Sequence, residues 1–487
     1  MASGPKVDIG RDLVCFVTAQ AGYEVTDTAG ESYPEAADAI RVITGSGGGS
    51  IAFNPREDKF GTATAVPGIP QKRTAEGSIE GYVMPSGSRT TAPDIDELLT
   101  SSGWTKIDRS GTTTTSGASS TAHVLDCSSV TGFEKGDAIM VETSATSELY
   151  EMRRIVSIYA PSDQITVEPP LTFTPATGAN IKGAIGYKPN DTRDTSEDAL
   201  TLWLLNNNSG DRLAGWTPGS TSFTMGGEDA ARFSTSGTAQ RHARLFMTGI
   251  DGTLVTGATS VTVDDALASS GDLLNTYWLL DDGSTANEAI KVTAISGTTW
   301  TITRGAVSGY PNPGTTWPDS TTLVPFRPSG TYAGDPVPAT SGQIVVSYGG
   351  YGEANAMELQ CNSATLDCGF GLTYREDEMG LLFKSAGYVM SPREVTATLS
   401  GWSIRDANMI AAMQAWQTTE IAGGSSQQLS VACVSGQEEG LMFGWVAPRL
   451  RTEDMSLDRG AEEITLDLSG RCEGTSSGAD EILLMFG

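Results

Sequence analysis

The most constraining feature of this chain is a strict alternation of apolar and polar residues near its C-terminus. In residues 394–402, Val395, Ala397 and Leu399 alternate with charged or hydroxyl-bearing residues, and residues 364–372 and 463–468 repeat the pattern. A period of two places successive side chains on opposite faces of a strand. These segments therefore predict antiparallel strands with one buried and one polar face, and a chain that is mainly β.

Helical signals are few. Met409, Met413 and Trp416 follow one another at spacings of four and three, which predicts a helix at residues 406–416. Such an apolar stripe is more typical of packing against a sheet than of cofactor binding. A shorter helix is expected to begin at Pro93, because proline and acidic residues favour the first turn.

Residues 51–103 predict an arm. A short strand at 50–53 is followed by a long loop at 54–73 and a returning strand at 74–83. A loop of this length inside a compact domain is usually functional or disordered, and this one mixes charges with isolated apolar residues. We expect it to project and to pack on another molecule. Its candidate contacts are Arg56, Phe60, Val66, Ile69, Lys72 and Arg73.

The Gly/Ser-rich residues 45–50 just before this arm are expected to form a flexible turn. No Lys-Ser/Thr pair follows them and no helix opens after them, so they do not predict a phosphate-binding loop.

Two regions of short alternating runs predict inserted β-modules. The first spans residues 117–188 and the second spans 253–327, and Glu151 precedes Ile158 by the same interval as Glu288 precedes Ile295. Self-similarity of this kind indicates two copies of one module inserted into a host domain. The host is expected at residues 1–110, 189–250 and 342–487. We expect the first module to fold alone, so that the host still assembles without it.

Composition narrows the function. The formal net charge is −28, which argues against wrapping DNA but permits a surface along which DNA passes. Simple solubility is the more common explanation of such a charge. The six cysteines form no C-x-x-C pair and the two histidines, His123 and His242, have no partner at metal-ligand spacing. We expect His123 to be partly buried and His242 to lie on the surface.

No catalytic motif is present, and we expect no enzyme, metal or cofactor. Carboxylate pairs are abundant, but in an acidic chain they do not single out a hydrolase site. Trp203, Trp278 and Trp300 fit either sugar-binding platforms or, more commonly, buried core positions. No segment has the length and apolarity of a membrane helix, and the first residues lack the apolar core of a signal peptide, so we expect synthesis in the cytoplasm and no membrane partner.

Several of these stretches resemble the tail tube protein (major tail protein) of long-tailed bacteriophages. The resemblance rests on residues 11–17 with 39–42, the loop 54–73 leading into 74–87, residues 92–99, the strand 391–402 before the helix 406–416, residues 444–449, and residues 481–483. It implies a β-sandwich or half-barrel of two antiparallel sheets with a flanking α-helix, decorated here by the two inserted small β-modules.

The resemblance also implies a structural role without catalysis. Six copies would close into a ring, and rings would stack into a tube that delivers the genome, with the loop 54–73 reaching the next ring. The implied partners are other copies, the tape measure and terminator proteins of the tail, and double-stranded DNA that passes without specific binding. The implied location is the tail of the virion, after assembly in the host cytoplasm; contractile and non-contractile tails both stay open.

Two polar strand faces are candidates for the lining of such a tube. Glu76, Ser78 and Glu80 share one side of one strand, and Glu394, Thr396 and Thr398 share one side of another. Both faces fit the outer solvent equally well. The terminal strand 481–487 is expected to pair inside its own domain, or alternatively with a neighbouring copy. The alternatives to a tube subunit are a β-rich surface or glycan-binding virion protein, decoration or fibre-like, and a β-rich hydrolase.

Overall fold

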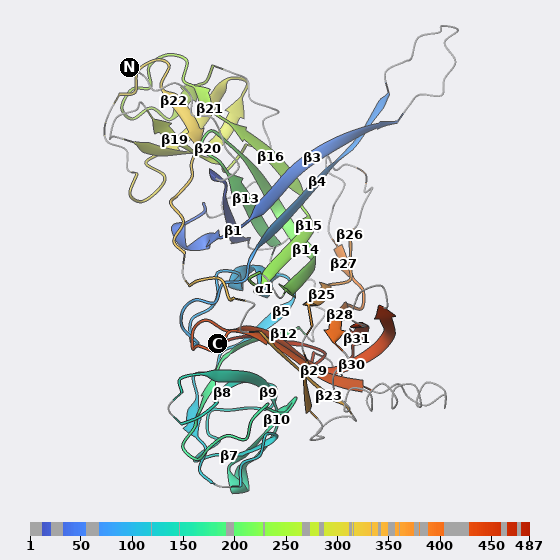
Figure 1. The fold of residues 1–487 in the computed structure, drawn as a ribbon. Coiled ribbons are helices and arrows are strands. Elements are labelled where there is room, and N and C mark those ends of the chain that lie inside the picture. The colour runs from blue at the N-terminus through green and yellow to red at the C-terminus, as the bar shows by residue number, and fades with distance from the viewer. Residues whose placement is uncertain are drawn as a thin grey trace, which may run out of the picture.

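The structure is a computed structural model that describes residues 12–20, 33–54, 68–117, 119–145, 147–190, 199–226, 229–264, 273–281, 287–310, 314, 316–332, 334–338, 342–348, 356–359, 361–374, 379, 388–403, 428–458, 465–474 and 479–487. The protein is mainly β, with antiparallel sheets of which two curl into half-barrels. The predicted fold class is confirmed. The molecule is elongated, with a small β-module at each end and a long hairpin that projects from the body (Figure 1).

The body consists of two halves that contain the same set of strands. The first half contains β1 (Val14–Gln20), β2 (Ala39–Ile40), β3 (Thr44–Asn54), β4 (Ile69–Tyr82), β13 (Ala199–Leu205), β14 (Ser209–Gly226), β15 (Arg232–Thr238) and β16 (Arg241–Phe246). The second half contains β23 (Gln343–Tyr348), β24 (Ala356–Leu359), β25 (Ser363–Gly369), β28 (Glu394–Ser403), β29 (Gln428–Ser435), β30 (Phe443–Asp458), β31 (Thr465–Cys472) and β32 (Leu483–Phe486).

The two halves also pair their strands in the same way. In the first half, β1 pairs with β2 and β13, and β3 pairs with β4, which pairs with β15. The long strand β14 pairs with β13 and β16 along its first part and with β15 along its second part. Strands β23 to β32 repeat every one of these pairings, with β30 in the place of β14. A bulge interrupts both long strands at the equivalent place, between Pro218 and Ser220 and between Thr452 and Asp454.

This repeat refines the expected organisation. Sequence analysis treats residues 1–110, 189–250 and 342–487 as three parts of one host domain. In the structure, strands of the first two parts build the first half, apart from the strand at residues 104–107, which extends a sheet of the second half. Strands of the third part build an equivalent second half. The chain therefore carries two host units.

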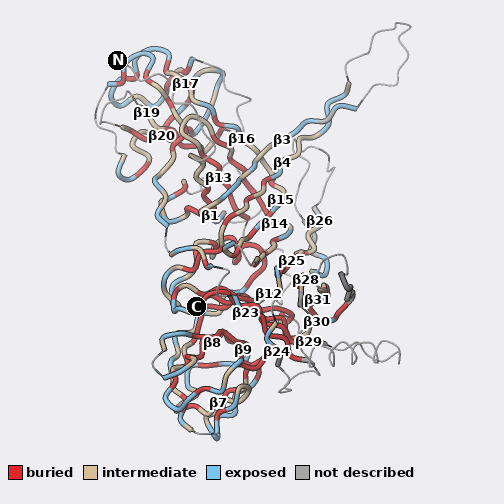
Figure 2. Tube along the Cα trace, in the orientation of Figure 1, coloured by how far each residue is buried: buried red, intermediate tan, exposed pale blue. Residues whose placement is uncertain are grey.

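One sheet, here called the front sheet, runs across both halves in the order β3–β4–β15–β14–β25–β28–β31–β30. A backing sheet lies behind each half. The first is β2–β1–β13–β14–β16; the second is β24–β23–β29–β30–β32, extended by β12 (Ile185–Pro189) and β5 (Trp104–Ile107). One continuous apolar core, with members such as Leu202, Phe223 and Leu468, fills the space between front and backing sheets (Figure 2).

The two modules share one topology. The first contains β6 (Thr112–Thr114), β7 (Val124–Asp126), β8 (Ala138–Glu142), β9 (Tyr150–Tyr159), β10 (Gln164–Glu168) and β11 (Asn180–Gly183), and the second contains β17 (Thr248–Gly249), β18 (Ser260–Thr262), β19 (Tyr277–Asp281), β20 (Glu288–Ser296), β21 (Thr299–Arg304) and β22 (Thr322–Pro325). The sheet orders are β6–β11–β8–β9–β10–β7 and β17–β22–β19–β20–β21–β18, which are identical when each module is numbered from its own first strand.

Each module packs on the outer side of one backing sheet, away from the front sheet. Met140 and Met152 of the first module join a buried cluster with Val434 and Met485 of the second backing sheet. Trp278 and other residues of the second module join a cluster with residues of the first backing sheet, among them Trp203, Leu205 and Ala243.

The remaining regular elements are short. They are α1 (Asp96–Ser101), the 3-10 turns η2 (Ala36–Asp38) and η3 (Ala160–Ser162), and the hairpin of β26 (Leu372–Tyr374) and β27 (Tyr388–Met390). Helix α1 begins at Asp96 instead of Pro93, and the predicted helix at 406–416 lies outside the described residues. Strand β32 pairs with β30 and β12 of its own chain, which confirms the preferred alternative for the terminal strand.

The expectation of a flexible turn at residues 45–50 is wrong, because these residues belong to β3. Gly45 and Gly47 face the first backing sheet, where added Cβ atoms would stand 2.9 Å from Leu204 Cδ2 and 2.7 Å from Leu213 Cδ1. Glycine in a strand permits this close approach of two backbones. The glycines therefore reflect a packing requirement.

The long loop is also shorter than expected. Strand β3 continues to Asn54 and β4 begins at Ile69, so Ile69, Lys72 and Arg73 belong to a strand, while Arg56, Phe60 and Val66 lie outside the described residues. Cross-strand pairing continues along the hairpin up to Asn54 and Ile69. The apolar and charged residues that suggested a loop thus lie partly on an extended two-stranded ribbon.

Candidate functional site

The outer face of the front sheet is polar over its whole width. Its residues align in rows across the strands because the pairing registers place them opposite one another. One row contains Ser46, Ser78, Ser236, Ser220, Gly369 and Glu394, and the next contains Thr44, Glu80, Ser234, Ser222, Asp367, Thr396 and Arg471. A third contains Tyr82, Arg232, Thr224, Thr365, Thr398 and Ser469. We call this surface the polar face.

The opposite side of the same strands is apolar. Ile79, Phe223, Leu366, Ala397 and Leu468 alternate with the residues of the polar face and are all 2% exposed or less. The alternation seen in the sequence thus decides which side of the front sheet is buried. The polar face is the side left to solvent or to a partner.

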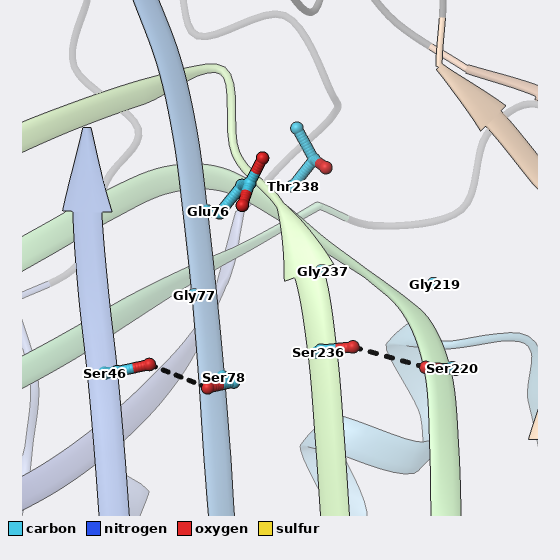
Figure 3. A pocket seen from close by; sticks show the side chains of 9 residues that line it. All are labelled: Ser46, Glu76, Gly77, Ser78, Gly219, Ser220, Ser236, Gly237 and Thr238. Carbon is cyan, nitrogen blue, oxygen red and sulfur yellow. Dashed lines mark hydrogen bonds between the residues drawn. The ribbon is translucent and has the colours of Figure 1, made fainter. Parts of the chain in front are cut away.

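Hydroxyl groups dominate the first row (Figure 3). Ser46 and Ser78 share a hydrogen bond of 2.8 Å between their Oγ atoms, and Ser220 and Ser236 share one of 3.3 Å. Together with Glu76, Thr238 and three glycines, these serines line a hollow of about 340 Å³. Glu76 is the one charged residue that lines the hollow, so the hollow offers hydroxyl dipoles and no cation.

The charged groups of the polar face are partly paired. Arg232 lies 3.3 Å from Glu80 and also binds Asp229. The hydrogen bond with Asp229 raises the pKa of Arg232. The hydrogen bond from the Ala230 amide, followed by that from Arg232, lowers the pKa of Asp229. Both groups stay charged at neutral pH, and the cation is held among carboxylates.

The structure brings the six candidate lining residues together. Glu76, Ser78 and Glu80 come from β4 in the first half, and Glu394, Thr396 and Thr398 come from β28 in the second half. All six lie on the polar face, with Glu80 and Thr396 in a single row. Sequence analysis did not place them on one sheet, and it missed Ser46, Ser220, Ser234 and Ser236 between them, because their partners are distant in sequence.

The arm residues have a different environment. Phe53 and Ile69 are 61% and 59% exposed near the outer end of the β3–β4 hairpin, which projects beyond the body (Figures 1 and 2). Gln71 donates a hydrogen bond to Asn54 across this hairpin. Lys72 and Arg73 lie on β4 between these residues and the body. The described part of the arm thus combines exposed apolar residues with half-buried basic residues.

A second arm starts at the equivalent place in the second half, and sequence analysis missed it. Strands β26 and β27 continue the β25–β28 hairpin, as the outer parts of β3 and β4 continue the first one. Leu372 is opposite Met390 where Phe53 is opposite Pro70 in the first arm. The short length of β26 and β27 left no clear signal in the sequence.

The histidines and acidic residues form no metal-ligand cluster in the described part of the chain. No group of three or more His, Cys, Asp or Glu side chains is placed there to hold a metal ion. His123 is half-buried as expected, and burial lowers its pKa. His242 is not a surface residue: its side chain is 11% exposed and its Nε2 lies 2.7 Å from Asp211 Oδ1, because β16 packs under the β3–β4 hairpin.

The tryptophans and cysteines are structural. Trp203, Trp278 and Trp300 are 2%, 0% and 0% exposed, so they form no sugar-binding platform. All six cysteines are free, and burial raises the pKa of Cys361, the most exposed of them, to about 12. A thiol with that pKa is a poor nucleophile at neutral pH.

No protein-family model and no curated protein sequence matches this chain. No helix in the described ranges is long and apolar enough to cross a membrane.

Proposed function

We propose that the protein is the structural subunit of a bacteriophage tail tube, in which the polar face lines the bore. The observation that carries this proposal is the continuous front sheet, which has a hydroxyl-rich outer face and an unbroken apolar core behind it. Such a sheet suits closure into a cylinder, because closure removes exposed strand edges. Rings of equivalent units would then stack through the arms.

The charges of the polar face support passage of DNA without binding. Acidic residues outnumber basic ones on the polar face: the strand pairings place Glu76, Glu80, Asp367, Glu394 and Asp467 there, against Arg232, Arg471 and Arg451, which is opposite Arg471. DNA-binding surfaces instead gather cations that neutralise phosphates. Salt screens such repulsion beyond about 8 Å, so the lining would keep DNA off the wall without propelling it.

The modules and arms fit the same arrangement. Both modules lie behind backing sheets, on the side opposite the polar face, and so would decorate the outside of the tube. The arms would reach the neighbouring ring, with Phe53 and Ile69 as apolar contacts. The proposal needs no cofactor, and the tape measure and terminator proteins of a virion tail would be the partners at the tube ends.

Electron microscopy of the purified protein tests the proposal. We expect rings or tubes, and a gold cluster attached to Thr398→Cys should appear inside the bore. The matched control is Thr131→Cys on the first module, whose gold cluster should appear outside. A particle that stays monomeric, with or without affinity for glycans, would overturn the proposal, and so would gold from position 398 on the outer wall.

A further inference from the structure

The junction between the two halves is an ordinary antiparallel strand pair. The second part of β14 has β15 on one side and β25 on the other. At this junction Ser220 is opposite Gly369, Ser222 is opposite Asp367, and Thr224 is opposite Thr365. The last front strand of the first unit, β14, therefore pairs with the first front strand of the second unit, β25.

The same two edges remain open at the ends of the front sheet. The equivalent of β14 is β30, and the equivalent of β25 is β3. In the described chain, β3 pairs with β4 alone, and residues 452–458 of β30 pair with β31 alone. An open edge presents unpaired backbone N–H and C=O groups, which form a template for another strand.

The repeat also fixes the register that these edges would share. Ser220 and Asp454 are equivalent because each follows the bulge of its long strand. From Ser220 the pairings lead through Ser236 and Ser78 to Ser46. From Asp454 they lead through Ser469 and Thr398 to Thr365, so Ser46 and Thr365 hold equivalent positions. The bulges place Ser222 and Ser456 at equivalent positions of the long strands, each two residues beyond the residue that follows the bulge. Gly48 is then the equivalent of Asp367.

We infer that β30 of one copy pairs with β3 of the next copy in the register of the β14–β25 junction, and that three copies close the ring. Ser456 of one copy lies opposite Gly48 of the next, Asp454 opposite Ser50, and Asp458 opposite Ser46. The ring count rests on the proposed function and on the ring of six tail tube units that the resemblance to tail tube proteins implies. Each chain supplies two such units, so three chains supply six, in place of the six chains expected from the sequence.

Glycine at the open edge fits this contact. An added Cβ atom at Gly48 would meet nothing within 4 Å in the isolated chain. Gly48 shares the polar face with Ser46 and Ser50, so a cysteine introduced there has room in the isolated chain and should not disturb its fold. Antiparallel pairing around the ring repeats one heterologous contact, which closes by rotation.

Engineered disulfides test the register. Directly opposed residues of antiparallel strands have Cα atoms about 4.5–5.5 Å apart, within reach of a disulfide, whereas diagonal neighbours are about 7–8 Å apart. We expect the double variant Gly48→Cys/Ser456→Cys to lose its monomer band on oxidation and to form a ladder that ends at three chains on a non-reducing denaturing gel.

Two controls accompany this experiment. Ser222→Cys/Asp367→Cys is the equivalent pair inside one chain and should cross-link without changing the chain number, while Ser46→Cys/Ser456→Cys is out of register and should stay monomeric on the gel. One outcome is that the internal pair cross-links in assembled tubes while the Gly48→Cys/Ser456→Cys pair does not. That result would overturn the register and leave the proposed function intact. A ladder reaching six chains would overturn the count, and protein that never assembles would overturn the proposed function itself.

Discussion

Gly47 lies so close to Leu213 that the first atom of any side chain at this position would stand 2.7 Å from the leucine Cδ1. The contact joins β3 of the front sheet to β14 of the first backing sheet across the apolar core. It explains why glycine occupies this position at the base of the projecting arm. The base of the arm is therefore packed against the core of the first half and is not a hinge.

Gly47→Val should therefore destabilise the first half. Overpacking of a filled core costs about 1–3 kcal/mol, because neighbouring side chains must leave their preferred rotamers. Thermal unfolding followed by circular dichroism should show a lower Tm. Gly48→Val is the matched control, since no atom lies within 4 Å of a Cβ added there. Equal loss of Tm in the two variants would contradict the packing explanation.

The buried carboxylate of Glu288 organises the second module. It is 0% exposed, lies 2.6 Å from Arg304 and accepts a hydrogen bond of 2.8 Å from Trp317 Nε1. Glu288→Gln leaves the arginine charge buried without its counter-ion, which costs about 3–5 kcal/mol. We expect earlier urea unfolding of this module, read from tryptophan fluorescence.

The control for this variant is Glu473→Gln, because the Glu473–Arg451 pair is largely exposed, at 30% and 52%. Exposed pairs contribute about 0–1 kcal/mol. If both variants unfold at the same urea concentration as the native protein, the buried pair does not stabilise the module.

The first module should not be separable from the body without damage. Met152 is 0% exposed and belongs to the cluster shared with the second backing sheet, and Lys182 and Arg89 both pair with Glu439, at 2.6 and 3.0 Å. Deleting the module would expose this apolar surface, so we expect the shortened chain to aggregate and to bind a hydrophobic dye. This revises the expectation from sequence that the host assembles without it.

A point substitution gives the same test without a deletion. Met152→Ala should cost about 2–5 kcal/mol, whereas Thr131→Ala on the exposed side of the module should change stability by no more than about 0.5 kcal/mol. A soluble deletion variant that forms normal tubes would show that the shared cluster is dispensable.

Local patterns predicted the alternating strands of the second half and the presence of two related modules. The alternation around Val395 and Leu399 identified the buried face, and the matching intervals after Glu151 and Glu288 indicated the repeat of the modules. In the structure these two glutamates occupy equivalent positions, opposite Val141 and Leu280, and each is paired with an arginine. Periodicity within one strand carries this information because it depends only on neighbouring residues.

The duplication of the body could not be predicted in the same way. Equivalent positions hold different residues, as with Gly47 and Leu366, because one strand crosses another at close range and the other packs an ordinary core. The polar face depends on pairings such as Ser78 with Ser236 and Ser222 with Asp367, which join residues more than a hundred positions apart. No local pattern encodes such pairings.

The stability of the first module should depend on pH through Glu142. Burial alone would raise the pKa of this carboxyl, but hydrogen bonds from the backbone N–H groups of Asn180 (2.9 Å) and Glu148 (3.2 Å), from the Asn180 side chain, and the charge of Lys182 together lower it. A lowered pKa in the folded state stabilises the fold above the unfolded pKa, about 4.3, and this contribution is lost as pH falls through the folded pKa. The free energy of unfolding of the native protein should therefore fall more steeply with acid than that of Glu142→Gln.

Asp137 in the same module provides a contrast of opposite sign. Burial raises its pKa, and hydrogen bonds from the Glu134 amide and from Arg109 only partly oppose this. A raised pKa in the folded state means that the carboxyl favours folding most below its unfolded pKa, about 3.9, and less as pH rises through the folded value. Urea unfolding of the native protein, Glu142→Gln and Asp137→Asn between about pH 3 and 7 should therefore give stability differences that change in opposite directions with pH. Parallel curves for the three proteins would show that neither carboxyl is linked to folding as its contacts imply.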